Sequence, residues 1–241
     1  MSSTPPTARD YTAIYDPDAD FDSHYTMATV ARVAERVAPG QRVLELGCAT
    51  GLMTAALVAR GARVSAIDRS QAYLERARER AGESTTLVRA GLEEPGWEEI
   101  VGGGFDHVLA CNLIHEMDDP VALLARARDV LADDGLVHLS LQNPQSIHRL
   151  VALEMGLIDD LREISERGAR FDTRGLWSAD ELVDLARDAG LGVIAREGVM
   201  LKPLPNAMMA ALAPDVLDGF ARAARHLPGH CAMTYLVLAR G

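Results

Sequence analysis

The chain has 241 residues, of which 48% are hydrophobic and 24% charged, the composition of a globular protein long enough for one α/β domain with additions. A net charge of −11 with a single lysine, Lys202, argues against a nucleic-acid partner, because phosphates favour a basic surface. There is no apolar run of the ~20 residues that a membrane span needs, and no apolar N-terminal secretory signal. Three separated cysteines indicate a reducing, cytoplasmic location, without a disulfide framework or a metal site.

Helix and strand patterns alternate through the first 140 residues, which predicts a doubly wound parallel sheet. Asp133-Asp134-Gly135 reads as a turn before the fifth strand. Helices are predicted over 25–37, 51–60, 70–81 and 119–131, and strands over 43–46, 63–68, 85–88, 105–111 and 136–141.

The regular alternation stops after Asn143. Ser178 to Glu181 forms a capping box, which predicts the start of a helix that stops at Gly190. The other predicted elements are helices over 147–155, 158–166, 206–212 and 216–225, and strands over 191–199 and 232–239.

The segment Arg42–Gly51, R-V-L-E-L-G-C-A-T-G, is an apolar strand, a small-residue loop and a helix start. Such a loop presents backbone N–H groups to a ligand. The next apolar strand ends at Asp68, where nucleotide sites of this architecture hold a ribose. A dinucleotide fingerprint would need glycine at positions 47, 49 and 52, but the chain has Ala49 and Leu52, so a nicotinamide cofactor is disfavoured.

The pattern of Glu45, Gly47 and Gly51 followed by Asp68 resembles the class I S-adenosylmethionine-dependent methyltransferases. Their consensus is E/D-x-G-x-G-x-G, and Ala49 replaces the middle glycine, which makes the loop less permissive at positive φ. The resemblance implies a Rossmann-like seven-stranded sheet, mostly parallel with an antiparallel last strand, within one domain over 1–241. It further implies a cofactor-binding core over 41–143, an N-terminal lid segment over 1–40 and substrate-side helical inserts over 144–176 and 200–230.

The resemblance also assigns cofactor-binding residues for S-adenosylmethionine, with S-adenosylhomocysteine as the product. Asp68, followed by Arg69, would hold the ribose hydroxyls. Glu45 has two open interpretations: support of the loop, or reception of the methionine amino group. The loop residues expected beside the methionine moiety are Gly47, Cys48, Ala49 and Gly51; those expected at the adenine are Gly91 and Leu92, with Glu93 as a substitute; and those expected near the methyl group are Cys111 and Asn112.

His115 is the candidate general base, because a histidine with a pKa near neutrality suits proton removal from an attacking hydroxyl or amine. The alternative is that it packs on the loop after the fourth strand. Substrate contacts are expected from aromatic and polar residues of the additions, with simple packing as the alternative: Tyr11, Tyr15, His24, Tyr25, Asn143 and His148.

The predicted function is in-line methyl transfer to an N or O atom of a small molecule, such as a secondary metabolite. The acidic surface and modest inserts favour a small acceptor. A peptide or protein acceptor and a catalytically silent S-adenosylmethionine-binding scaffold are the alternatives. The insert over 200–230 is the candidate surface for a homodimer.

Overall fold

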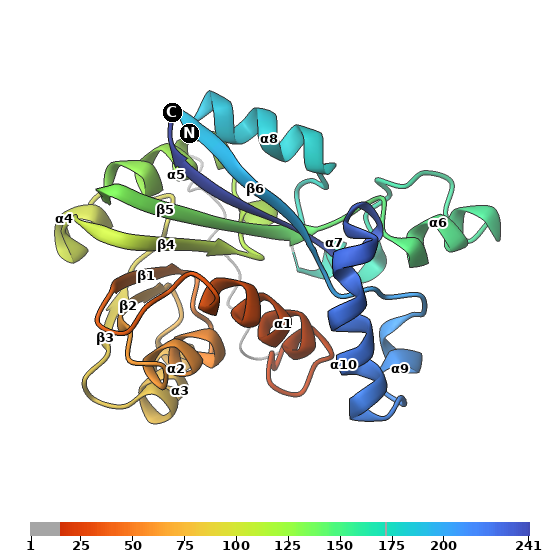
Figure 1. Ribbon diagram of the computed structural model, residues 1–241, viewed down its shortest axis with the longest axis horizontal. Helices are drawn as coiled ribbons and strands as arrows, with labels where there is room; N and C mark the ends of the chain where they lie inside the picture. The colour runs from red at the N-terminus through yellow and green to blue at the C-terminus, as the bar shows by residue number, and fades with distance from the viewer. Residues whose placement is uncertain (1–14, 172) are drawn as a thin grey trace, which may run out of the picture.

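The computed structural model describes residues 15–171 and 173–241, and its centre is one seven-stranded sheet (Figure 1). The strand order is β3-β2-β1-β4-β5-β7-β6. Strand β7 runs antiparallel to both β5 and β6, and the remaining pairs are parallel, so the predicted mostly parallel sheet with an antiparallel last strand is confirmed. The strands are β1 (Arg42–Leu46), β2 (Arg63–Asp68), β3 (Thr86–Arg89), β4 (Phe105–Cys111), β5 (Leu131–Gln142), β6 (Leu191–Val199) and β7 (Met233–Arg240).

Helices cover both faces of this sheet (Figure 1). In β1, Val43 packs into one apolar cluster, whereas Leu44 and Leu46 pack into the other, because successive side chains of a strand point to opposite faces. The first face carries α1 (Asp22–Ala34), α2 (Leu52–Val58) and α3 (Gln71–Ala81); the second carries α4 (Trp97–Val101), α5 (Pro120–Asp129) and α8 (Ala179–Asp188).

The predicted helix starts rest on side-chain caps that the structure contains. The Ser70 hydroxyl accepts the Tyr73 N–H at the start of α3, and α8 begins with the complete Ser178–Glu181 capping box. Asp119 caps α5, which has Pro120 in its first turn. These local signals therefore located three of the helices that cover the sheet.

Two predicted elements differ from the structure, and one observed helix was not predicted. The helix expected over 158–166 is wrong, since the helix there is α7 (Glu166–Arg170). The turn expected at 133–135 lies inside β5, where a shift in register against β4 forms a bulge. Helix α4 was not predicted, because it spans a single short turn after Gly96, which has a φ of 107°.

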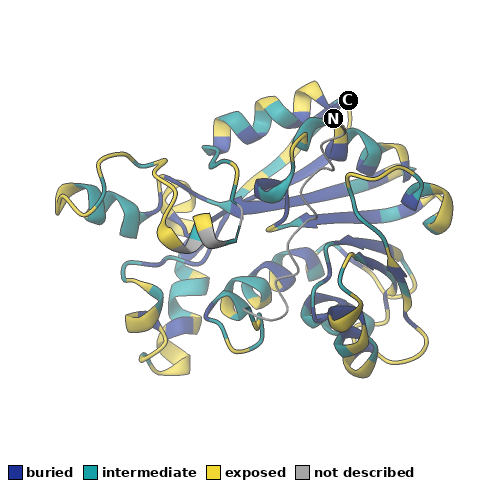
Figure 2. Ribbon diagram, turned by 180° about the vertical axis from the view of Figure 1, so that it is seen from behind, coloured by how far each residue is buried: buried dark blue, intermediate teal, exposed yellow. Residues whose placement is uncertain are grey.

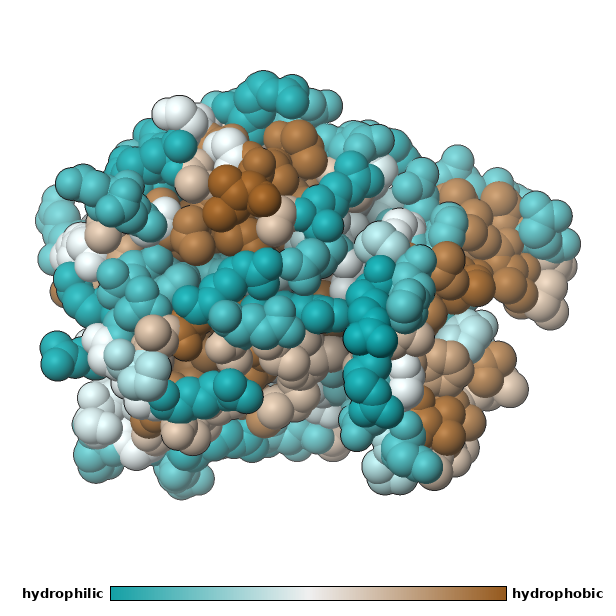
Figure 3. Space-filling view, in the orientation of Figure 1, coloured by the Kyte–Doolittle hydropathy of each residue, from teal (hydrophilic) through white to brown (hydrophobic). Residues whose placement is uncertain are grey.

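The inserts form a helical extension beyond one end of the sheet (Figure 1). Helix α6 (Ile147–Glu154) has no buried residue among those described, and the extension is largely teal and yellow in Figure 2. Apolar side chains gather on α6 and on the helices after β6 in Figure 3. None of the described helices combines the length and apolar character needed to cross a membrane. The remaining elements are α9 (Asn206–Met209), α10 (Pro214–Ala223), and the short 3-10 turns η2 (Ile114–Glu116), η3 (Ala224–His226) and η4 (Pro228–His230).

Candidate active site

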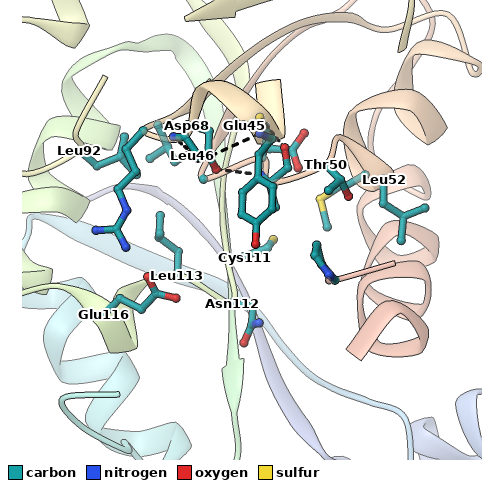
Figure 4. Close-up of a pocket in the computed structure, with 18 of the residues that line it drawn as sticks. Glu45, Leu46, Thr50, Leu52, Asp68, Leu92, Cys111, Asn112, Leu113 and Glu116 are labelled. Carbon is teal, nitrogen blue, oxygen red and sulfur yellow. Dashed lines mark hydrogen bonds between the residues drawn. The ribbon is translucent and has the colours of Figure 1, made fainter. Parts of the chain in front are cut away.

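A cavity of about 1060 Å³ lies at the carboxyl ends of β1, β2, β4 and β5, where open α/β sheets bind ligands (Figure 4). It brings together the ends of strands and the N-terminal segment. Ten of the eleven residues predicted to bind cofactor line it: Glu45, Gly47, Cys48, Ala49, Asp68, Arg69, Gly91, Leu92, Cys111 and Asn112.

The loop after β1 turns sharply through backbone conformations with positive φ. Gly47 has a φ of 72°, and a Cβ placed on it would lie 3.0 Å from Leu113 Cδ1. Ala49 has a φ of 44°, which costs a non-glycine residue about 1–2 kcal/mol. The N–H groups of Gly47 and Cys48 both donate to the carbonyl of Ile67 in β2, at 2.9 and 3.0 Å. The loop is therefore fastened to the neighbouring strand while its backbone borders the cavity.

Asp68 joins this loop to the start of α3. One carboxylate oxygen accepts the Ala49 N–H at 2.9 Å, and the other accepts the Ser70 N–H at 2.8 Å. Burial raises the pKa of Asp68, and these two backbone donors act in the opposite direction by stabilising the charged form. Each oxygen retains a lone pair for a further donor.

Glu45 lies at the cavity wall and is only 6% exposed. It accepts a hydrogen bond of 2.5 Å from the Thr54 hydroxyl of α2. Burial raises its pKa to about 8, so its carboxyl group is mostly protonated at neutral pH. The bond to Thr54 supports the interpretation of Glu45 as a loop support, and its position at the wall leaves it able to receive a cationic group.

Gly91 and Leu92, in the loop after β3, line one end of the cavity. A Cβ on Gly91 would lie 2.9 Å from Glu94 Oε1, the flexible end of a side chain that can move aside. Glu93, considered as a substitute for the acid expected at Gly91, also lines the cavity, and its carboxylate accepts the N–H of Asp118 at 2.5 Å. That bond links this end of the cavity to the loop after β4.

Residues 15–21, the segment before α1, border the cavity through Tyr15, Pro17 and Asp18, and we call this segment the strap. Asp18 accepts a hydrogen bond from Thr50 at 2.9 Å and pairs with Arg76 and Arg80 of α3 at 2.6 and 2.7 Å. The Tyr15 ring packs 4.9 Å from that of Phe171, in the 144–176 insert. The strap thus connects the cofactor loop, α3 and the insert.

One face of α1 borders the cavity, and Tyr25 is the only one of its four residues predicted from the sequence. Asp22, Tyr25, Thr26 and Thr29 all line it, at the spacing i, i+3, i+4 and i+7 that places residues on one helix face. The Tyr25 hydroxyl donates to Asn206 of α9 at 3.1 Å, which ties this face to the second insert. The signal available in the sequence was the spacing of these polar residues beside the buried Val30 and Val33.

The described residues that line the cavity do not include His115. It is buried, and burial lowers its pKa to about 4. Its ring Nδ1 has no hydrogen-bond partner within 15–171 and 173–241, and its carbonyl accepts the N–H of Arg174 at 2.8 Å. The position matches the packing alternative better than contact with an acceptor.

Of the residues predicted to contact the substrate, Tyr15 and Tyr25 line the cavity. Asn143, His148 and His24 instead contact other residues of the protein. The Asn143 amide donates to the carbonyls of Gly229 and Cys231. His148 lies 3.4 Å from Lys202, and the His24 ring packs against Phe21. Tyr11 lies outside the described residues.

Gly51 also stands apart from the cavity wall. Its φ is 74°, and a Cβ on it would lie 2.7 Å from that of Ala77. The glycine is required for close packing of α2 on α3, so its part in the pattern is steric.

Sequence and structure comparisons agree with this geometry. Residues 44–137 match the family described as Methyltransferase domain. The chain is 30% identical over 172 residues to a ubiquinone biosynthesis O-methyltransferase of Ruegeria pomeroyi, covering 70% of this chain and 67% of the relative. It is 28% identical over 169 residues to the protein of the same name from Cereibacter sphaeroides; this match spans 66% of that relative, just under two thirds. The magnesium protoporphyrin IX methyltransferase of Synechocystis, solved with bound S-adenosylhomocysteine, superposes with a TM-score of 0.60 at 18% identity, covering 92% of this chain and 84% of that one.

The chain belongs to the class I S-adenosylmethionine-dependent methyltransferases. S-Adenosylmethionine is the cofactor of this family, and the described residues fit it. Gly47 keeps the loop backbone open to the cavity, and Asp68 offers carboxylate oxygens at the end of β2. The predicted family and cofactor are therefore confirmed, whereas the roles of individual residues stay predictions.

Proposed function

We propose that this protein transfers the methyl group of S-adenosylmethionine to an oxygen or nitrogen atom of a small molecule, with oxygen favoured. The observation that carries the proposal is the hydrogen bond from the Ala49 N–H to the Asp68 carboxylate, which joins the loop after β1 to the end of β2. Both residues border a cavity that extends to Asn112 and Ser140. The relatives named O-methyltransferases support the preference for oxygen. A secondary metabolite as acceptor remains part of this proposal.

The bound cofactor supplies an electrophilic methyl group, and the protein contributes alignment and exclusion of water. Asp68 and the backbone of Gly47 would hold the nucleoside and methionine portions. The strap, held to α3 through Asp18, would cover the bound molecules. Because His115 is buried and is not among the described residues that line the wall, we assign it a packing role on the loop after β4.

The test is transfer of a labelled methyl group from S-adenosylmethionine to three sets of acceptors: small alcohols and phenols, small amines, and arginine- or lysine-rich peptides. Label in an alcohol or phenol at a rate above buffer supports the proposal. Label confined to peptides would identify the peptide alternative. Tight cofactor binding without transfer to any set would favour a silent scaffold.

We also propose that the protein is cytoplasmic and forms a homodimer. The three cysteines are free thiols, which supports a reducing, cytoplasmic compartment. Exposed Met208, Val216 and Leu227 on the second insert support a homodimer through that surface. Sedimentation that finds a monomer across the accessible concentration range would contradict the dimer.

A further inference from the structure

The strap, the loop after β1 and helix α3 meet at one side chain, Asp18. Two nitrogens of the Arg80 guanidinium donate to its two carboxylate oxygens, at 2.8 and 2.7 Å, in a fork-like charged pair. One of these oxygens also accepts a hydrogen bond from Arg76 at 2.6 Å, and the other accepts one from the Thr50 hydroxyl at 2.9 Å. Burial acts to raise the pKa of Asp18, but the hydrogen bonds from Arg80 and Thr50 outweigh it and lower the pKa, so the paired form is charged. Asp18 therefore holds the strap to the same two elements that Asp68 joins.

Two further contacts attach the strap to α3. Asp16 pairs with Arg76 at 2.8 Å, and the Tyr73 hydroxyl donates to the backbone carbonyl of Tyr15 at 3.0 Å. Tyr15 and Asp18 from the strap, and Tyr73 from α3, all line the cavity. The contact between the strap and α3 is consequently part of the cavity wall.

The strap is held by polar contacts more than by burial. None of residues 15–20 is buried, and Phe21 is the first residue of the segment that packs into the core. The charged side chains are themselves partly exposed, by 23% for Asp18, 30% for Arg80 and 39% for Arg76. Ion pairs at such positions contribute little each and are screened by salt, and segments with few buried apolar contacts open most easily. The strap can therefore separate from α3 while the sheet stays folded.

We propose that Asp18 is a positioning residue for the cofactor and sets how long the product S-adenosylhomocysteine stays bound. While its carboxylate pairs with Arg76 and Arg80 and accepts the Thr50 hydroxyl, the strap closes one side of the cavity. The product leaves when these contacts separate and the strap moves away from α3. This inference rests on the proposed function, since it concerns release of the product of that methyl transfer.

The test is the dissociation rate of S-adenosylhomocysteine from the immobilised full chain, measured by surface plasmon resonance. Asp18→Asn keeps the shape of the side chain and removes its charge. We expect it to release the product roughly three- to tenfold faster, between the scale of an exposed ion pair and that of a charged hydrogen bond. Asp184→Asn is the matched control, because it removes the partner of Arg187 in an exposed pair outside the cavity wall, and it should leave the rate unaltered.

Three further measurements separate a charged latch from a general disturbance of the site. Raising sodium chloride from about 0.05 M to about 0.5 M should speed release from the wild type, and less so from Asp18→Asn. Arg80→Gln should also speed release, and its combination with Asp18→Asn should add little, because both remove the same contact. S-Adenosylhomocysteine should slow amide hydrogen exchange over residues 15–21 in the wild type, and clearly less in Asp18→Asn.

The outcomes distinguish failure of this inference from failure of the proposed function. A folded wild type that does not bind S-adenosylhomocysteine would remove the proposed function itself. With that binding intact, a wild-type release rate that does not change with salt would overturn the role of Asp18, and this result needs no variant. Equal release rates in the wild type and Asp18→Asn, or fully multiplicative effects of Asp18→Asn and Arg80→Gln, would overturn it as well.

Discussion

The carboxylate of Asp68 accepts the backbone N–H of Ala49 at 2.9 Å, so the acid that ends β2 also holds the loop that follows β1. The same carboxylate accepts the N–H of Ser70 and thereby fixes the start of α3. A single side chain thus organises both sides of the cavity at which the nucleoside is expected. A change in the loop should consequently affect both stability and cofactor binding.

Ala49→Gly should stabilise the protein by about 0.5–1 kcal/mol. Glycine relieves the strain of a φ of 44°, and this gain exceeds the extra freedom that glycine gives the unfolded chain. Urea unfolding measures the change. Ala152→Gly in the exposed helix α6 is the control and should destabilise the protein by about 0.5–1 kcal/mol. Destabilisation by Ala49→Gly would contradict the assigned strain.

Gly51→Ala should cost clearly more stability than Gly96→Ala, although both glycines have left-handed backbone conformations. A Cβ at Gly51 would lie 2.7 Å from that of Ala77, whereas nothing lies within 4 Å of one at Gly96. We expect about 1–2 kcal/mol for Gly96→Ala from backbone strain, and about 1–3 kcal/mol more for Gly51→Ala from overpacking. Equal losses in the free energy of unfolding, measured in urea, would show that α2 and α3 move apart to accommodate the added methyl group.

A chain of buried hydrogen bonds crosses β4, β5 and β7 beneath the cavity. The Tyr235 hydroxyl lies 2.6 Å from His138 Nδ1, and His138 Nε2 lies 2.9 Å from His107 Nδ1. His107 Nε2 lies 3.0 Å from the Gln41 side-chain oxygen, which only accepts. Each ring therefore donates through Nε2 and accepts through Nδ1, and both histidines are neutral.

This chain makes the stability of the protein fall in acid. Burial lowers the pKa of His138 to about 3 and also lowers that of His107, whereas an unfolded histidine titrates near 6.5. The unfolded state then binds more protons below about pH 6.5, so stability is full above that pH and declines as the pH falls toward 3. His138→Gln should flatten this dependence in urea unfolding, whereas His226→Gln, an exposed control, should not. Equal slopes in the wild type and His138→Gln would contradict the assignment.

Glu45 should release a proton when S-adenosylhomocysteine binds. Its pKa of about 8 in the free protein means that the carboxyl is mostly protonated at pH 7, and a cationic amino group beside it favours the ionised form. Affinity should therefore rise as the pH rises from about 6.5 to 8. Calorimetry in two buffers of different ionisation enthalpy measures the released proton. If Glu45→Gln releases the same number of protons as the wild type, Glu45 is a loop support through Thr54 alone.

Much of the scaffold could be predicted from the sequence, because its signals are local. Strands β4 and β6 have the predicted bounds, and each begins directly after a glycine, Gly104 or Gly190. The loop after β1 and Asp68 could also be predicted to lie together, because adjacent parallel strands bring their carboxyl ends to one edge of the sheet.

The end of the cavity at β4 and β5 could not be predicted in the same way. The positive φ of Asn112 turns the chain so that Ile114 and His115 fold inward, and no periodic pattern encodes that turn. Ser140 reads as one more residue of a buried strand, and its place at the cavity wall depends on how β5 pairs with β4 and β7. Such juxtapositions arise from tertiary packing.

The most direct test of the central claim is calorimetric titration of the wild type, Asp68→Ala and Asp134→Ala with S-adenosylhomocysteine. Asp134 is an exposed acid in the β5 bulge and serves as the matched control. We predict micromolar binding by the wild type and the control, and a loss of roughly 1–3 kcal/mol in Asp68→Ala, the scale for hydrogen bonds to a charged group. Absence of binding by a folded wild type, or equal affinity in all three proteins, would contradict the account.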